Sequence, residues 1–135
     1  MKSIPTPKLN TGNVESKRQE ILDYFNDSFL TYESLFNQLA TDDAFYERPE
    51  KLRHPLIFYY GHTATFFINK LVLAKLLDTR INPDFESLFA IGVDEMSWDD
   101  LNDENYNWPD VQAVREYRQQ VKKQVSELIR HIDFT

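Results

Sequence analysis

Apolar residues recur along this chain at intervals of three and four positions, the pattern of helices that bury one face. The first such stripe consists of Leu22, Phe25, Phe29, Tyr32, Phe36 and Leu39. Ahead of it, Asn13 can cap a helix and Glu15 suits the positive end of the helix dipole. The pattern predicts a helix over residues 14–41, behind an N-terminal arm over residues 1–13.

A second, more apolar stretch begins at Pro55, because proline is tolerated in the first turn of a helix. No other proline occurs before Leu77, so residues 55–77 are predicted to form a long helix. Its length approaches that of a membrane span, but it contains four polar residues that would be costly in lipid: His62, Asn69, Lys70 and Lys75. A transmembrane helix is therefore rejected.

A third helix is predicted after Pro109-Asp110, with its apolar positions again three or four apart: Val111, Val114, Val121, Val125, Leu128 and Ile132. Arg118 interrupts this stripe. An arginine on a buried face either extends to solvent or meets a buried carboxylate. For Arg118 we favour a structural role over ligand binding.

The connection over residues 78–109 is too long for a simple turn between helices. Asn82-Pro83 can start a short helix, and Ser97-Trp98-Asp99-Asp100 resembles a capping box that could start another. Residues 81–114 include nine Asp or Glu and no Lys or Arg. We interpret this crossover as a solvated connection pinned by Trp98, Tyr106 and Trp108. The alternative is a wall that binds a cation or an amine.

Composition narrows the class of protein. The chain has 135 residues, 41% of them hydrophobic, which is enough for one domain with its own core. A net charge of −7 argues against nucleic acid or an anionic membrane as the main partner. The absence of cysteine excludes disulfides, thiolate metal sites and cysteine nucleophiles from this chain. The N-terminus lacks the apolar core of a secretory signal, so a cytoplasmic location is expected.

These elements predict an all-α fold of the four-helix-bundle type in which the chain supplies only three long helices. The fourth bundle helix is expected to be missing from this chain. An apolar groove would then stay exposed, or be filled by a second copy in a homodimer, by a swapped segment or by a further part of a longer protein.

His62 is the most conspicuous polar residue of the second predicted helix. It lies among aromatic residues, so it is either a satisfied core histidine or a ligand for Zn or Fe that needs further ligands from other helices. His54 is eight residues away, about 12 Å along a helix, and Pro55 should place it outside the helix. His131 lies near the far end of the chain, and no H-x-x-x-H pair occurs. Spacing alone favours the core histidine.

Longer stretches of the sequence resemble a known protein family. The segment 52–77, with Gly61-His62-Thr63 at its centre, resembles the second helix of DinB-like four-helix bundles in the sulfoxide synthases of thiol-histidine biosynthesis. The whole chain looks more closely like the N-terminal part of the 5-histidylcysteine sulfoxide synthases of ovothiol biosynthesis. The similar strings are residues 9–12, 17–18, 53–59, 68–71, 80–83, 89–101 and 117–118.

The resemblance implies a non-haem Fe(II) held by three histidines, which uses O2 to join the sulfur of cysteine to the imidazole of histidine as a sulfoxide. His62 matches the first iron ligand of the family. The other two belong to an H-x-x-x-H-x-E motif on the fourth bundle helix, which this sequence lacks. Also absent are a formylglycine-generating-enzyme-like domain and the methyltransferase domain that often follows. We therefore expect the isolated chain to bind no iron specifically and to catalyse nothing.

Relatives that form ergothioneine hold their thiol substrate with arginines from the corresponding crossover, which here is acidic. We do not transfer that role, and we name Trp98, Asp99 and Asp100 only as substrate-proximal candidates whose simpler role is to tether the crossover. Two other functions remain open. One is a stand-alone DinB-like interaction or dimerisation module, and the other is a DinB-like metal-dependent hydrolase or thiol transferase, which would need two more ligands.

Overall fold

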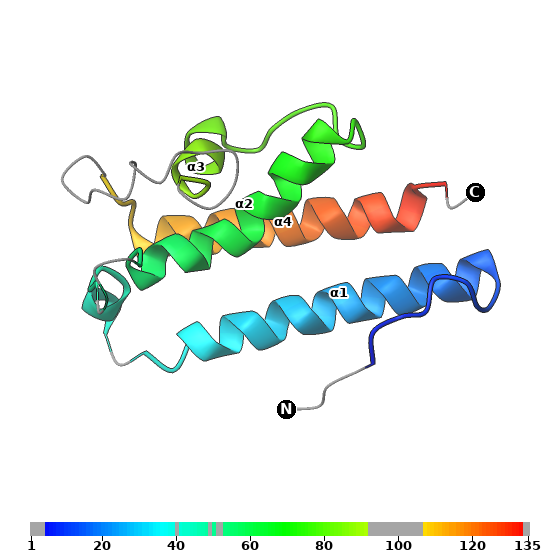
Figure 1. The fold of residues 1–135 in the computed structure, drawn as a ribbon, viewed down its shortest axis with the longest axis horizontal. Coiled ribbons are helices and arrows are strands. Elements are labelled where there is room, and N and C mark those ends of the chain that lie inside the picture. The colour runs from blue at the N-terminus through cyan, green and yellow to red at the C-terminus, as the bar shows by residue number, and fades with distance from the viewer. Residues whose placement is uncertain (1–4, 40, 49, 51–52, 92–106, 134–135) are drawn as a thin grey trace. The chain divides into compact units, whose positions relative to one another are not determined.

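The computed structural model describes residues 5–39, 41–48, 50, 53–91 and 107–133. Within these ranges the chain forms four α-helices and one 3-10 helix, and no strand (Figure 1). The long helices are α1 (Val14–Phe36), α2 (Leu56–Leu73) and α4 (Val111–His131). The short ones are η1 (Asp42–Phe45) and α3 (Pro83–Leu88). The all-α class, the three long helices and a short helix in the crossover are thus confirmed.

The chain divides into two compact units, and α4 contributes to both. The first unit comprises Met1–Gln38 and Lys122–Thr135, and the second comprises Leu39–Val121. No described helix is long and apolar enough to cross a bilayer.

In the first unit, α1 begins as the sequence predicts. The side chain of Asn13 accepts a hydrogen bond from the Ser16 backbone N–H at 2.8 Å, which satisfies one of the unpaired donors of the first turn. Near the same end of α1, Nη1 of Arg18 donates to the carbonyls of Ile129 and Ile132, each at 2.6 Å. The Ile129 carbonyl belongs to the last turn of α4 and the Ile132 carbonyl to the residue just after it, where no intrahelical donor remains for them.

The predicted end of the first helix at residue 41 is wrong, because α1 stops at Phe36. The Gln38 N–H bonds to the Leu35 carbonyl, three residues back, so the turn tightens after the helix. The apolar stripe continued to Leu39, but periodicity does not mark the residue at which backbone bonding changes.

In the second unit, α2 starts after Pro55, which is its N-cap, and ends at Leu73 rather than at Leu77. Lys75 has a φ of 62°, in the left-handed region. The N–H groups of Leu76 and Leu77 both turn back to the Leu71 carbonyl, at 2.9 and 3.2 Å. This C-terminal motif stops the helix although apolar residues continue beyond it.

The short helix predicted at Asn82-Pro83 is confirmed as α3. Asn82 caps it through a 3.1 Å bond from the Phe85 N–H to its side-chain oxygen, and Pro83 occupies the first helical position. The second predicted start, at residues 97–100, lies outside the described residues, as do Trp98 and Tyr106.

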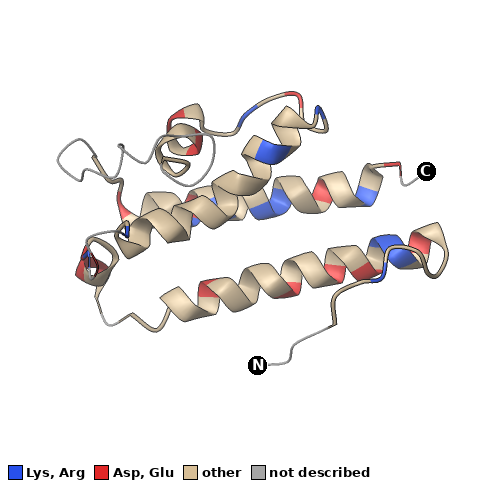
Figure 2. Cartoon of the chain, in the orientation of Figure 1, with Lys and Arg blue, Asp and Glu red and all other residues tan. Residues whose placement is uncertain are grey.

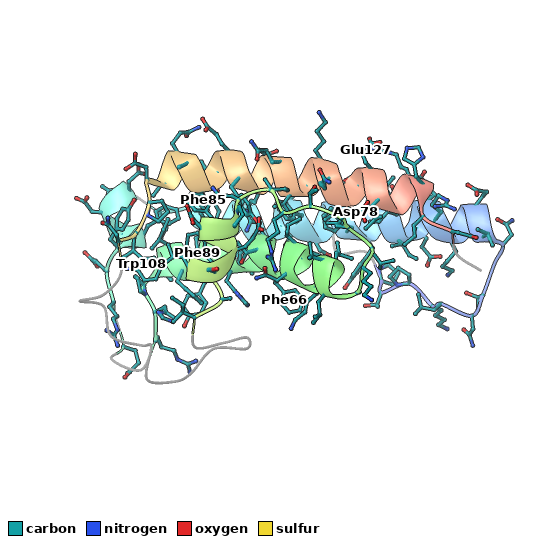
Figure 3. All side chains as sticks on the ribbon, turned by 90° about the horizontal axis from the view of Figure 1, so that it is seen from above. Phe66, Asp78, Phe85, Phe89, Trp108 and Glu127 are labelled. Carbon is teal, nitrogen blue, oxygen red and sulfur yellow. The ribbon has the colours of Figure 1, made fainter. Side chains whose placement is uncertain are left out.

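The core of the second unit is aromatic. Phe45, Phe58 and Phe89 are each no more than 1% exposed. Trp108 packs against the rings of His54, Phe58 and Phe89, with centroids 6.0–6.2 Å apart, so the predicted pinning role of this tryptophan is confirmed (Figure 3). The helix at the centre of this core, α2, carries a single charged residue, Lys70 (Figure 2).

Candidate metal-ligating histidine

His62 lies in the middle of α2 and is half-buried. Its ring stacks on Phe58, one turn earlier, with centroids 5.5 Å apart and ring planes 7° from parallel. The edge of Phe66 meets it from the following turn, at 6.0 Å. The prediction that His62 lies on or beside the packed face is confirmed.

One ring nitrogen of His62 has a main-chain partner. Nδ1 lies 2.8 Å from the carbonyl oxygen of Phe89. A carbonyl only accepts hydrogen bonds, so Nδ1 carries the proton, and in the neutral ring Nε2 carries the lone pair. Nε2 has no hydrogen-bond partner among the described residues. A donated Nδ1–H with an open Nε2 is the arrangement in which an imidazole can bind a metal.

Gly61 allows Phe89 to approach α2 this closely. A Cβ atom at residue 61 would lie 2.6 Å from three atoms of the Phe89 ring, a separation that real Cβ atoms do not show. Phe89 is the C-cap of α3, and its ring is fully buried. The glycine and the histidine therefore contact the same residue, one through its ring and the other through its carbonyl.

His54 stands in contrast to His62. It precedes α2, as predicted from Pro55, and is 2% exposed. Its Nε2 lies 2.9 Å from the Ile91 carbonyl, and its ring stacks on Phe58 at 3.9 Å. His54 thus has the role of a satisfied core histidine, which spacing had favoured for His62.

The third histidine, His131, belongs to the first unit. Its side chain is 76% exposed, and Nε2 lies 3.3 Å from a carboxylate oxygen of Glu127 (Figure 3 labels Glu127). Among the described residues no group of three His, Asp or Glu side chains could hold a metal ion.

Sequence reasoning missed a buried carboxylate beside α2. Glu86 on α3 has a fully buried side chain, although it belongs to the crossover that was interpreted as solvated. Its Oε2 accepts the hydroxyl hydrogen of Tyr117 and the N–H of Asn82, each at 2.8 Å. Oε1 lies 3.4 Å from Nη1 of Arg80, which also donates to Asn69. The spacing of Asn82 and Glu86 about the start of α3 was the available signal.

This network also changes the acid-base behaviour of Tyr117. Burial raises the pKa of its hydroxyl far above the usual 10.0, and the hydrogen bond and negative charge of Glu86 raise it further. The Tyr117 hydroxyl therefore keeps its proton at an alkaline pH at which an exposed tyrosine would lose it. Beside the network, Arg80, Glu86 and apolar residues of α2 and α3 line an open groove of about 640 Å³.

Arg118 is fully buried, so the alternative in which it extends to solvent is wrong. Its Nη1 donates to the Tyr60 carbonyl and to the Thr63 hydroxyl, both at 2.6 Å. The guanidinium carbon also lies 4.9 Å from the centre of the Tyr60 ring. These contacts tie α4 to α2 at the residues on either side of His62 in the sequence, as expected for a structural arginine.

Trp98, Asp99 and Asp100, named above as substrate-proximal candidates, lie outside the described residues. In a comparison with known protein families, residues 8–135 match the family described as "DinB superfamily". A comparison with curated proteins found no match.

Proposed function

The chain belongs to the DinB superfamily, and on this premise we propose that it is the N-terminal helical portion of a non-haem iron enzyme. In this proposal the intact enzyme is an O2-dependent sulfoxide synthase that joins cysteine to histidine in ovothiol biosynthesis. The observation that supports it most directly is the state of His62, whose Nδ1 is engaged by the Phe89 carbonyl while Nε2 stays open. His62 is also the residue that matches the first iron ligand of those enzymes.

The fit to iron is that of one ligand. An imidazole nitrogen suits Fe(II), and His62 would bind through Nε2. The described residues provide no further cluster of donors, so the other two ligands are proposed to come from an H-x-x-x-H-x-E motif outside this sequence. When bound, iron would supply the activation of O2. The contribution of this chain is to hold one imidazole in a fixed orientation.

The proposed partners follow from the same assignment. They are the fourth bundle helix, a formylglycine-generating-enzyme-like domain and a methyltransferase domain in the same protein, with cysteine and histidine as substrates in the cytoplasm. Alone, residues 1–135 are proposed to retain no iron and to show no activity, because a single imidazole does not hold Fe(II).

The test uses the protein together with the sequence encoded after Thr135. Iron per chain and O2-dependent coupling of cysteine to histidine are measured for the unaltered protein, for His62→Ala and for His131→Ala. We expect His62→Ala to lose both iron and coupling, and the exposed His131→Ala to keep both. Full coupling activity in His62→Ala would overturn the assignment.

A second candidate function is a helical interaction module without catalysis. It is favoured by the end of α2, where Leu73 is 70% exposed and Leu76 is 46% exposed. Sedimentation of residues 1–135 over a range of concentrations tests it. Association that is lost in Leu73→Asp would support the module, and a monomer at every concentration would count against it.

A further inference from the structure

We propose that Gly61 and Phe89 are positioning residues for His62. The ring of Phe89, seated against Gly61, holds the Phe89 carbonyl where it selects the Nδ1-protonated tautomer of the imidazole and leaves Nε2 to a ligand. The importance of this for iron rests on the proposed function, but the positioning is a property of this chain alone and can be tested without metal.

The first step is the close approach at Gly61. Any other residue would place a Cβ 2.6 Å from the ring atoms of Phe89, so either the ring or α2 would have to move. The ring is 0% exposed and also contacts Phe58, Phe85 and Trp108, which leaves it little room (Figure 3). Because buried side chains are close-packed, an added methyl would displace Phe89 as a whole.

The second step concerns the Phe89 carbonyl. The carbonyls of Phe85 and Ser87 accept the N–H groups of Phe89 and Ala90 at the end of α3. The Phe89 carbonyl lies just after the helix and accepts a hydrogen bond from the Nδ1–H of His62 instead. A buried carbonyl without a donor is unfavourable, so the imidazole and the end of α3 satisfy each other.

The third step is the orientation of the ring. Stacking on Phe58 at an interplanar angle of 7° fixes the plane of the imidazole. A 180° flip of the ring about its Cβ–Cγ bond would keep the stack on Phe58. It would also put a carbon in the place of Nδ1 and lose the 2.8 Å bond to Phe89. The stack and the hydrogen bond together leave one orientation, with Nε2 as the available nitrogen.

The fourth step is the attachment of α3 itself. Asn69, two turns after His62 on α2, donates from Nδ2 to the Glu86 carbonyl at 2.9 Å. The side chain of Glu86 is held by Tyr117 and by the N–H of Asn82. The segment that carries Phe89 is therefore fixed on its N-terminal side, to α2 through Asn69 and to α4 through Tyr117.

The experiment records ¹⁵N-detected imidazole spectra of the metal-free chain in mildly alkaline solution. The chain has only three histidines, so each ring can be assigned. We expect His62 to be protonated at Nδ1 and His54 at Nε2, because their carbonyl partners engage opposite nitrogens. Protonation of His62 at Nε2 in the unaltered chain would overturn the proposal, whatever the variants do.

Gly61→Ala then tests the role of the close approach. It should remove the single tautomer of His62, so that the shifts of the two ring nitrogens move toward each other. Gly12→Ala is the matched control: it also replaces a glycine by alanine, at a φ of 78° in the first unit, and should leave the His62 signals unchanged. A folded Gly61→Ala chain with the His62 tautomer intact would overturn the proposal.

A size swap covers the case in which Gly61→Ala does not fold. In the double variant Gly61→Ala, Phe89→Leu the smaller side chain makes room for the added methyl, and the Nδ1-protonated state should return. A folded double variant whose His62 is protonated at Nε2 would contradict the proposal.

The same substitution separates the positioning from the proposed activity. In the protein with the sequence after Thr135, Gly61→Ala should weaken iron binding by about 10- to 100-fold, the usual effect of losing a partner of a ligating histidine. If the tautomer result holds but the extended protein binds no iron, the positioning stands and the proposed function falls. If the extended protein binds iron but Gly61→Ala does not change the tautomer, the proposed function stands and the positioning falls.

Discussion

The hydroxyl of Tyr117 on α4 donates to Glu86 on α3 at 2.8 Å, across 31 positions of sequence. Both side chains are buried, with Tyr117 at 3% and Glu86 at 1% exposure. A buried carboxylate is tolerated only when hydrogen bonds compensate for the lost hydration. The stability of the second unit should therefore depend on each donor to Glu86.

Tyr117→Phe removes one of these donors and leaves the carboxylate in place. We expect the free energy of unfolding to fall by about 1–3 kcal/mol, the range for a buried polar group that loses a partner. Urea denaturation measures this. Tyr24→Phe is the control, because among the described residues the Tyr24 hydroxyl has only an exposed 3.4 Å contact with Thr6. Equal stability of the Tyr117→Phe and Tyr24→Phe variants would contradict the role of Glu86.

The raised pKa of Tyr117 predicts a loss of stability in alkaline solution. Above pH 10.0, the ordinary tyrosine value, the unfolded chain releases this proton while the folded chain retains it. The folded state then binds more protons, so its stability is complete below that pH and falls above it, by up to about 1.4 kcal/mol per pH unit. Urea midpoints measured from neutral to alkaline pH should fall less steeply for Tyr117→Phe than for the unaltered chain. Parallel curves would contradict the prediction.

Arg118→Lys should destabilise the second unit although the charge is kept. Lysine lacks the planar guanidinium that lies over the Tyr60 ring while its Nη1 donates to the Tyr60 carbonyl and the Thr63 hydroxyl. The expected loss is about 1.5–3 kcal/mol, as for a hydrogen bond to a charged group. The matched control is Arg115→Lys, three residues earlier on α4 and only half-buried, where we expect a change within about 0.5 kcal/mol.

Arg18→Ala should loosen the last turn of α4. Without the guanidinium, the carbonyls of Ile129 and Ile132 lose their side-chain donor. Hydrogen exchange of the Ile132 amide, which bonds to the Leu128 carbonyl at 2.8 Å, should accelerate by about tenfold or more. Arg130→Ala, which removes only an exposed pair with Glu127, should leave that amide unchanged. Equal exchange in both variants would show that Arg18 is not needed there.

Much of the fold could be predicted from the sequence, because the residues that start a helix lie next to each other in the chain. Asn13, Pro55 and Asn82 each mark a beginning that the structure confirms. The ends of the helices were harder to predict. At Lys75 the backbone adopts a left-handed conformation although the residue is not a glycine, and Leu76 and Leu77 beyond it prolonged the apolar pattern. Periodicity identifies which face is buried, whereas termination depends on backbone bonds that side-chain type only partly controls.

Only part of the candidate site could be predicted, because its contacts join segments that lie far apart in the sequence. A histidine among aromatic residues identified His62, but its hydrogen-bond partner is a main-chain carbonyl 27 residues away. Glu86 was placed with the solvated acidic residues, because composition does not show that Tyr117 and Asn82 enclose its carboxylate. Interactions that need two distant segments to meet have no signature in either segment alone.

The main-chain acceptors at Phe89 and Ile91 have an evolutionary consequence. Every residue type offers a carbonyl, so position 91 can drift without loss of the bond to His54, and position 89 is restricted only by the ring that fills the space over Gly61. In divergent sequences, the expected trace of this arrangement is a Gly-His pair followed 27 positions after the histidine by an aromatic residue. Such a trace would persist after most other identities had disappeared.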